Sequence, residues 1–209
     1  MKVTEHDYPW RHFEIEGLFL MENIKNARMT VPLVGDYQYD NDCERRKQTT
    51  ELRDHLSNDC NFLLDSLTSR EMVDKLSAIT GIPLEPDFTR RCAGIQLMFP
   101  GGYLNTHLDA ALHPNGLERR ANLILYLDNV SHRSGGGLQL CLPNGEAVKT
   151  IYPAAGTAIL WPCEDYSYHG VEQVSLTSGV RYSAAAFYLG PRRPGVTRER
   201  ALFIPNRGA

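Results

Sequence analysis

The sequence lacks any long apolar run. In its 209 residues, no stretch approaches the roughly 20 consecutive apolar residues that a membrane-spanning helix requires. The first seven residues, MKVTEHD, place charges where a secretory signal has its apolar segment. We therefore expect no membrane association and predict a soluble protein of the cytoplasm.

An excess of charge of one sign is lacking as well. The chain has 22 Lys and Arg against 25 Asp and Glu, which gives a formal net charge of -3. Proteins that bind nucleic acid or an anionic membrane surface usually carry a clear basic excess. We therefore expect no nucleic-acid partner and no membrane partner, and the composition gives no indication of the oligomeric state.

Paired cysteines are also missing. The chain has an odd number of cysteines at scattered positions, without a Cys-x-x-Cys pair: Cys43, Cys60, Cys92, Cys141 and Cys163. A disulfide-rich domain or a structural zinc site would show paired or regularly spaced cysteines. We predict reduced thiols, most of them buried as small apolar side chains.

The N-terminal part of the chain has a mixed character. Apolar and polar residues alternate between Trp10 and Ile15, which predicts a strand at a sheet edge. We expect His12, in this strand, to be partly exposed. Residues 35–50 are polar and aromatic without a period, so we predict a loop there. A solvated loop is the simpler interpretation, and a lid over a site is the alternative.

A helical period begins near residue 50. Leucines between residues 52 and 67 fit one or two helices. The segment Thr68-Ser69-Arg70-Glu71 is a capping-box pattern that predicts the start of another helix, and Gly81 predicts its end. We interpret these helices as a scaffold that carries no chemistry.

Short strand-like runs follow, separated by turns rich in Pro, Gly and Asn: 93–99, 103–109, 122–127, 137–142, 148–152, 157–161, 168–174 and 180–189. Eight such runs predict a mainly β fold, either a sandwich or a jelly-roll barrel. We see no linker and predict one domain over residues 1–209. In it, 1–90 form an N-terminal strand and supporting helices, 91–190 the strand-rich core and 191–209 a C-terminal tail.

The second run contains His107-Leu108-Asp109. Residues two apart in a strand point to the same face, so this imidazole and this carboxylate would lie side by side. They are two of the three ligands in the 2-His-1-carboxylate triad of non-haem Fe(II) oxygenases. With seven histidines and 25 acidic residues in the chain, the pattern alone can arise by chance. A third ligand must come from elsewhere.

The last two runs add candidate residues. His169 lies in the seventh run, and Arg181 opens the eighth. On that last strand, Arg181, Ser183, Ala185 and Phe187 would share one face. A cation, a hydroxyl group, a small gap and an aromatic ring would then line the same wall.

Over residues 93 to 190, the sequence resembles the prolyl 4-hydroxylase-like branch of the Fe(II)/2-oxoglutarate dioxygenases. The motifs that carry the resemblance are 100–104, 107–109, 119–128, 135–138, 168–171 and 179–183. The resemblance implies a double-stranded β-helix, a cupin-like jelly-roll barrel that holds iron inside one end. This expectation agrees with the strand pattern.

The resemblance assigns three iron ligands: His107, Asp109 and His169. Two imidazoles and a carboxylate hold ferrous iron and leave one face of the metal open. Arg181 matches the residue that binds the distal carboxylate of 2-oxoglutarate, to which a guanidinium can donate two charge-assisted hydrogen bonds. Tyr126 matches a tyrosine that supports the same carboxylate, and Ser183 is placed to help.

The substrate side of the predicted site is less defined. Phe187 stands where an aromatic substrate contact occurs in such enzymes, and Arg119 and Trp161 are candidate wall residues. Phe99 replaces a tyrosine that often precedes the Pro-Gly motif, which removes one hydroxyl contact. We expect His113 to be a rim residue and not a fourth ligand.

The resemblance implies hydroxylation of an unactivated C-H bond with decarboxylation of 2-oxoglutarate to succinate. Fe(II), 2-oxoglutarate and dioxygen would take part, and the resemblance allows ascorbate as a reductant. The favoured substrate is a prolyl residue in a peptide or protein; the alternatives are a free amino acid or a small metabolite. A non-catalytic jelly-roll binding module is the alternative from another class of protein.

Overall fold

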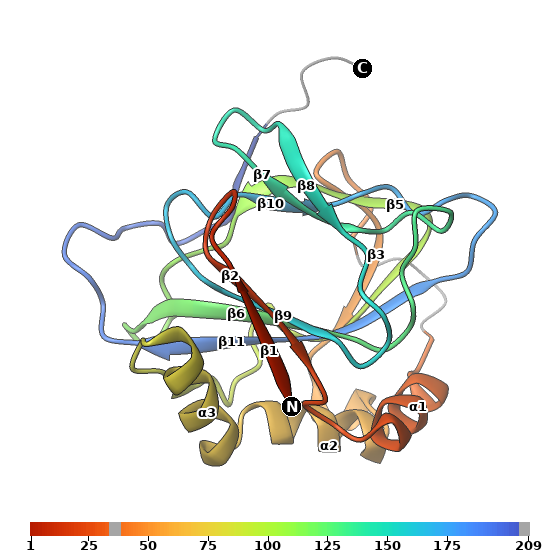
Figure 1. Ribbon diagram of the computed structural model, residues 1–209, viewed down its shortest axis with the longest axis horizontal. Coiled ribbons are helices and arrows are strands. Elements are labelled where there is room, and N and C mark those ends of the chain that lie inside the picture. The colour runs from red at the N-terminus through yellow and green to blue at the C-terminus, as the bar shows by residue number, and fades with distance from the viewer. Residues whose placement is uncertain (34–38, 205–209) are drawn as a thin grey trace.

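Strands dominate the computed structural model, which describes residues 1–33 and 39–204 (Figure 1). The strands are β1 (Lys2–His6), β2 (His12–Glu16), β3 (Glu44–Thr50), β4 (Glu85–Pro86), β5 (Gly94–Leu108), β6 (Glu118–Tyr126), β7 (Leu138–Cys141), β8 (Ala147–Ile151), β9 (Ala158–Pro162), β10 (His169–Val171), β11 (Arg181–Gly190) and β12 (Leu202–Phe203). The helices are α1 (Met21–Thr30), α2 (Asn58–Leu67) and α3 (Arg70–Thr80), with a 3-10 turn at Arg53–His55.

The strands form one curled antiparallel sheet. Its order is β1-β2-β9-β6-β11-β5-β10-β7-β8, with β3 and β12 added to β5 and β4 added to β11. Curling brings β7, β8 and β10 to one side and β6, β9 and β11 to the other (Figure 1). The predicted mainly β, jelly-roll fold is confirmed.

Strand β11 has two buried faces. Its even-numbered residues 182–188 join a core that α1, α2 and α3 share with the sheet. Its odd-numbered residues, which include Arg181, Ala185 and Phe187, face the interior of the barrel, where these three line a cavity. Along β11, residues of the packed core therefore alternate with residues that face the barrel interior, as the two-residue period of a strand predicted.

The helices cover one outer face of the sheet, beneath β6 and β11 in Figure 1. The capping-box pattern would make Thr68 the first cap of α3, but Ser69 takes that role and accepts a hydrogen bond from the Met72 amide at 3.2 Å. Thr68 instead ends α2 and donates to the Leu64 carbonyl at 3.0 Å. Gly81 ends α3 with a φ of 72°, as predicted.

The sequence did not indicate α1. This helix is largely polar and buries only Ile24 and Ala27. Its apolar periodicity is therefore too weak to detect without the sheet against which it packs. None of the helices in the described ranges combines the length and apolar character needed to cross a membrane.

The expected break at residues 100–102 is wrong, because β5 continues through it. Gly101 has a φ of 81°, and the pairing of β5 with β3 shifts register between Arg45 and Lys47. A bulge of this kind bends a strand and leaves the pairing on both sides intact. The first two predicted runs are therefore one strand, which carries His107 near its end.

The loop predicted for residues 35–50 is wrong over 44–50, which form β3. Residues 34–38 lie outside the described part of the chain, so the lid alternative is not addressed there. β3 pairs with β5, and its residues Gln48, Thr49 and Thr50 are buried. The edge of β5 supplies the hydrogen-bond partners, and a tertiary contact of this kind has no local signal.

Two further expectations need correction. His12 is completely buried, with 0 % exposure, because β2 pairs with both β1 and β9. The segment predicted as a C-terminal tail includes β12, which pairs with β5 at Leu108 and His107. Three of the five cysteines are buried and all five are free thiols, in agreement with the prediction.

Candidate metal centre

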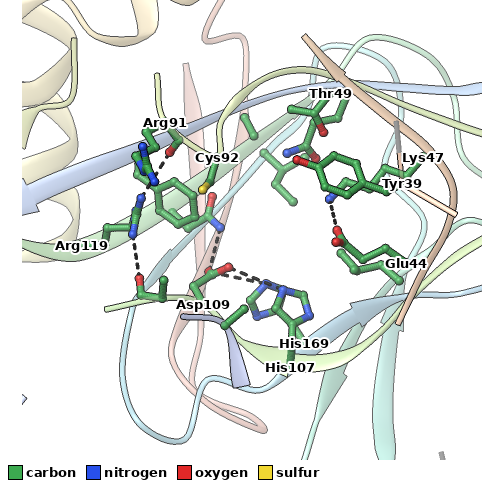
Figure 2. Close-up of a pocket in the computed structure, with 18 of the residues that line it drawn as sticks. Tyr39, Glu44, Lys47, Thr49, Arg91, Cys92, His107, Asp109, Arg119 and His169 are labelled. Atoms are coloured by element: carbon green, nitrogen blue, oxygen red, sulfur yellow. Dashed lines mark hydrogen bonds and ion pairs between the residues drawn. The ribbon is translucent and has the colours of Figure 1, made fainter. Parts of the chain in front are cut away.

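Two distant parts of the chain bring the predicted triad together. β5 ends at Leu108 with His107 before it and Asp109 after it, and His169 opens β10 directly opposite His107. The Nε2 of His107 lies 3.5 Å from Oδ1 of Asp109, and the Nε2 of His169 lies 3.6 Å from Oδ2. One ligand atom from each residue lies within 4.8 Å of the other two (Figure 2). This group could hold a metal ion.

Both imidazoles are fixed in the same tautomer. The Nδ1 of His107 lies 2.9 Å from the Asn105 carbonyl oxygen, and the Nδ1 of His169 lies 3.0 Å from the Ser167 carbonyl oxygen. A carbonyl oxygen only accepts, so each Nδ1 carries the proton and donates. The Nε2 lone pairs of both rings are therefore directed at the triad, as a metal site requires.

The charge states also suit a metal. Burial disfavours the Asp109 carboxylate, but its interactions with His169, His107 and Asn122 outweigh burial and lower its pKa. Burial lowers the pKa of His169 from 6.5 to about 4. At neutral pH the site therefore presents a carboxylate beside a neutral imidazole, which is the protonation state that divalent metal ions bind.

A buried cation completes one wall. The guanidinium of Arg181 donates to the Gly136 carbonyl at 2.9 Å, to the Ser183 hydroxyl at 3.1 Å and to the Tyr126 hydroxyl at 3.1 Å. In residues 1–33 and 39–204, no acidic side chain forms an ion pair with it. A buried charge without a counter-ion is costly. An anionic ligand would remove this cost.

The triad and Arg181 face one cavity of about 840 Å³. Figure 2 shows His107, Asp109 and His169 on one side of it, Tyr39, Glu44, Lys47 and Thr49 on a second side, and Arg91, Cys92 and Arg119 on a third. Ligand sites of enzymes are typically concave cavities of this size with a few convergent polar groups.

The comparison with protein families agrees with this arrangement. The model of the 2OG-Fe(II) oxygenase superfamily matches residues 93–189, the segment that contains the triad and Arg181. This core of the chain therefore matches the 2OG-Fe(II) oxygenase superfamily. No curated protein is significantly similar to the chain in sequence.

Solved structures share the fold of this oxygenase at low sequence identity. A prolyl-4-hydroxylase from Pseudomonas putida has a TM-score of 0.58 and 16% identity, over 87% of this chain and 92% of that one. HygX from Streptomyces hygroscopicus, with nickel and 2-oxoglutarate bound, has a TM-score of 0.56 and 14% identity, over 86% of this chain and 82% of that one. A prolyl hydroxylase from Trichoplax adhaerens, in complex with a hypoxia inducible factor peptide fragment, has a TM-score of 0.55 and 16% identity, over 85% of this chain and 83% of that one.

The protein is accordingly a 2-oxoglutarate-dependent dioxygenase, and its residues fit the iron and the cosubstrate of the superfamily. Two imidazoles and one carboxylate are the donor set for non-haem Fe(II). The buried, uncompensated guanidinium of Arg181 suits a carboxylate of 2-oxoglutarate. Gly136 leaves room for the Arg181 side chain, because a Cβ at position 136 would lie only 3.1 Å from Cδ of Arg181.

The predicted substrate residues of the oxygenase occupy different places. Phe187 and Arg119 line the cavity, with the guanidinium 4.9 Å from the centre of the Phe187 ring. Arg119 also donates to the Ala110 and Leu112 carbonyls. Trp161 does not line the cavity, which corrects its prediction as a wall residue. It is 0 % exposed, and its ring packs edge-on against His169 at 4.8 Å.

Sequence reasoning missed one polar wall of the oxygenase cavity. Lys47, Thr49 and Glu51 line it at intervals of two residues, as the face of a strand would. Glu44 lies 2.7 Å from the Lys47 ammonium, and both side chains are largely buried. The alternation 47-49-51 is the one signal that could have indicated this wall.

Asn122 was missed as well. It lies on β6, lines the cavity and donates from Nδ2 to Oδ2 of Asp109 at 3.0 Å. His113, predicted as a rim residue, lines the cavity but is buried; its Nε2 lies 3.6 Å from Asp87. It takes no part in the metal cluster, in agreement with the expectation that it is not a fourth ligand.

A second group of possible metal ligands lies on the β1–β2 hairpin: His6, His12 and Glu14. His12 donates from Nδ1 to the Trp10 carbonyl, and its Nε2 lies 3.0 Å from the Lys149 ammonium. An ammonium donates only, so it occupies the lone pair that a metal would need. In this group, the Lys149 ammonium on β8 therefore holds His12 of β2 by a hydrogen bond.

Proposed function

We propose that the protein is a hydroxylase in which His107, Asp109 and His169 hold Fe(II). When bound, Fe(II) and 2-oxoglutarate supply the oxidising chemistry: dioxygen is consumed, 2-oxoglutarate gives succinate and carbon dioxide, and one oxygen atom enters a substrate C-H bond. The observation that carries the proposal is the meeting of the triad and the uncompensated Arg181 in one cavity.

Each residue then has a physical role. The two imidazoles and the carboxylate would hold the metal, and a three-residue donor set of this kind would leave ferrous iron able to bind 2-oxoglutarate and dioxygen. The guanidinium of Arg181 binds the distal carboxylate of 2-oxoglutarate, and Tyr126 and Ser183 hold that guanidinium in place through their hydroxyl groups. Phe187 and Arg119 line the space that remains for the substrate.

The proposed substrate is a prolyl residue in a peptide or protein. Structures of similar fold include prolyl hydroxylases, one of them with a peptide bound. The aromatic ring of Phe187 in the cavity wall suits an apolar pyrrolidine ring.

A small polar metabolite or a free amino acid is the second candidate substrate. The cavity wall carries charged side chains on β3 and on the segment before β5, namely Glu44, Lys47, Glu51 and Arg91. Such groups would recognise hydrogen-bonding or charged groups around the reacting carbon. HygX, which shares the fold, has been solved with hygromycin B bound.

The decisive experiment is an anaerobic titration of the Fe(II)-loaded protein with 2-oxoglutarate. We expect the visible charge-transfer band of a 2-oxo acid bound to ferrous iron, and we expect His169→Ala to abolish it. Succinate formation is then measured with prolyl peptides, free amino acids and polar metabolites. No band and no succinate at saturating 2-oxoglutarate would overturn the proposal and favour a binding module.

A further inference from the structure

The C-terminal segment 191–204, here named the C-terminal strap, runs along the stretch that carries two of the proposed metal ligands. Leu202 and Phe203 pair with Leu108 and His107, and the Ile204 amide donates to the Thr106 carbonyl at 2.8 Å. Further back along the strap, the Arg198 carbonyl accepts hydrogen bonds from the amides of residues 111 and 112. The strap therefore binds the backbone both before Asp109, at residues 106–108, and after it, at residues 111 and 112.

Charged side chains anchor the strap to the barrel. Arg193 makes hydrogen bonds to the fully buried Glu118 and to Glu164. Arg198 donates from Nε to the Asp109 carbonyl at 2.8 Å and pairs with Asp165 at 2.6 Å. Breaking the contact of a buried carboxylate is expensive, so the docked position of the strap is strongly favoured.

Phe203 covers one face of the His107 imidazole. The two ring centres are 5.0 Å apart and the planes are inclined by 26°. The hydrogen bond from Nδ1 of His107 to the Asn105 carbonyl fixes one edge of the same ring, and His169 lies at 4.4 Å with its plane tilted by 51°. The imidazole therefore has little freedom to turn Nε2 away from the triad.

The strap also forms part of the cavity wall. Glu199, Arg200, Ala201 and Phe203 line the same cavity as the triad. Through Phe203, this part of the wall lies directly against His107.

We propose that the C-terminal strap is part of the active site and that Phe203 is a positioning residue for His107. The proposal rests on the proposed role of His107 as a metal ligand. Phe203 acts through the imidazole, which it holds in the orientation that the metal needs. If the strap only stabilised the barrel, its loss would lower the melting temperature without a specific effect on metal affinity.

The experiment compares two neighbouring residues of the strap. Phe203 stacks on His107, whereas Ile204 packs with the cluster of Leu108, Cys141 and Tyr168. Phe203→Ala and Phe203→Tyr test the ring, and Ile204→Ala is the matched control for loss of apolar contact in the same strap. Metal binding is followed by quenching of tryptophan fluorescence with Co(II), since Trp161 lies against His169.

We expect Phe203→Ala to weaken Co(II) binding about tenfold, in the range found for residues that orient metal ligands. Phe203→Tyr should bind like the wild type. Ile204→Ala should have a lower melting temperature but the affinity of the wild type. If Phe203→Ala does not fold, Phe203→Leu replaces it, because leucine keeps apolar volume without a planar ring.

Two results would overturn the proposal. One is wild-type affinity for Co(II) in Phe203→Ala, or in Phe203→Leu if that variant is used instead. The other is an equal loss of affinity in Ile204→Ala and in the Phe203 variant. The first would show that the ring does not orient His107, and the second that general docking of the strap is responsible. Failure of the wild-type protein itself to bind Co(II) would refute the proposed metal site instead.

Discussion

At the residue scale, Asn122 illustrates a conflict between stability and function. Its Nδ2 must point to Asp109 because a carboxylate only accepts hydrogen bonds. Its Oδ1 is then buried without a hydrogen-bond partner among the described residues. An unsatisfied buried acceptor costs about 1–3 kcal/mol. An apolar residue would therefore suit this position on β6 better if stability were the only requirement.

We predict that Asn122→Leu weakens metal binding about tenfold while the melting temperature changes little, because loss of the hydrogen bond to Asp109 and loss of the unsatisfied carbonyl have opposite effects on stability. The side chain that orients Asp109 is lost, and the unsatisfied carbonyl is lost with it. Co(II) titration and thermal unfolding of the metal-free protein measure the two effects.

Asn61→Leu is the matched control for this change. Asn61 is also buried, but it donates to the Arg53 and Leu56 carbonyls and accepts from Arg90. Its replacement should lower stability and leave metal affinity unchanged. A joint loss of stability and affinity in Asn122→Leu would refute a specific role in orienting Asp109.

Arg181 gives a second prediction at the residue scale. Arg181→Lys keeps the charge but cannot make the hydrogen bonds to Gly136, Ser183 and Tyr126 at the same time. We expect 2-oxoglutarate to bind about ten- to a hundredfold more weakly, which corresponds to loss of one charge-assisted hydrogen bond. Titration of the charge-transfer band measures this affinity. The affinity for Co(II) alone should stay unchanged, and unchanged 2-oxoglutarate binding would remove Arg181 from the proposed cosubstrate site.

At the element scale, the turn before β7 controls the position of Arg181. Gly136 has a φ of 76°, and an added Cβ would lie 3.1 Å from Cδ of Arg181. Gly116 has a similar φ of 88°, but an added Cβ would meet nothing within 4 Å. The two glycines therefore separate backbone strain from contact with the site.

We predict that Gly136→Ala and Gly116→Ala both lose about 1 kcal/mol or more of stability, because alanine is strained at positive φ. Only Gly136→Ala should weaken 2-oxoglutarate binding, since its methyl group pushes against the Arg181 side chain. Chemical unfolding and cosubstrate titration test the pair. Equal cosubstrate affinities in the two variants would contradict the packing of this turn against Arg181.

The elements also show where sequence reasoning succeeds and fails. β6, β7, β9 and β11 follow from short strand-like runs bounded by turn residues, because those signals lie within or beside each segment. β3 and β12 do not, since each is a strand only through its pairing with β5. The same limit applies to the site. His107, Asp109 and Arg181 belong to local motifs, whereas Asn122, Lys47 and Phe203 acquire their places only when distant segments meet.

At the scale of the whole molecule, the buried triad should make the metal-free protein sensitive to acid. Burial lowers the pKa of His169 from 6.5 to about 4. The unfolded chain takes up a proton at this imidazole below about pH 6.5, but the folded protein does not until about pH 4. The stability linked to His169 is therefore complete above the unfolded pKa and decreases as the pH falls toward the folded pKa.

We predict that this single group reduces the free energy of unfolding by about 3 kcal/mol over that interval. Urea unfolding of the metal-free wild type and of His169→Gln, in steps from neutral pH downward, isolates the contribution because glutamine binds no proton. As the pH falls, the free energy of unfolding of the wild type should decrease relative to that of the variant. Parallel curves would mean that His169 has the same pKa in the folded and the unfolded protein, and would contradict the lowering of its pKa by burial.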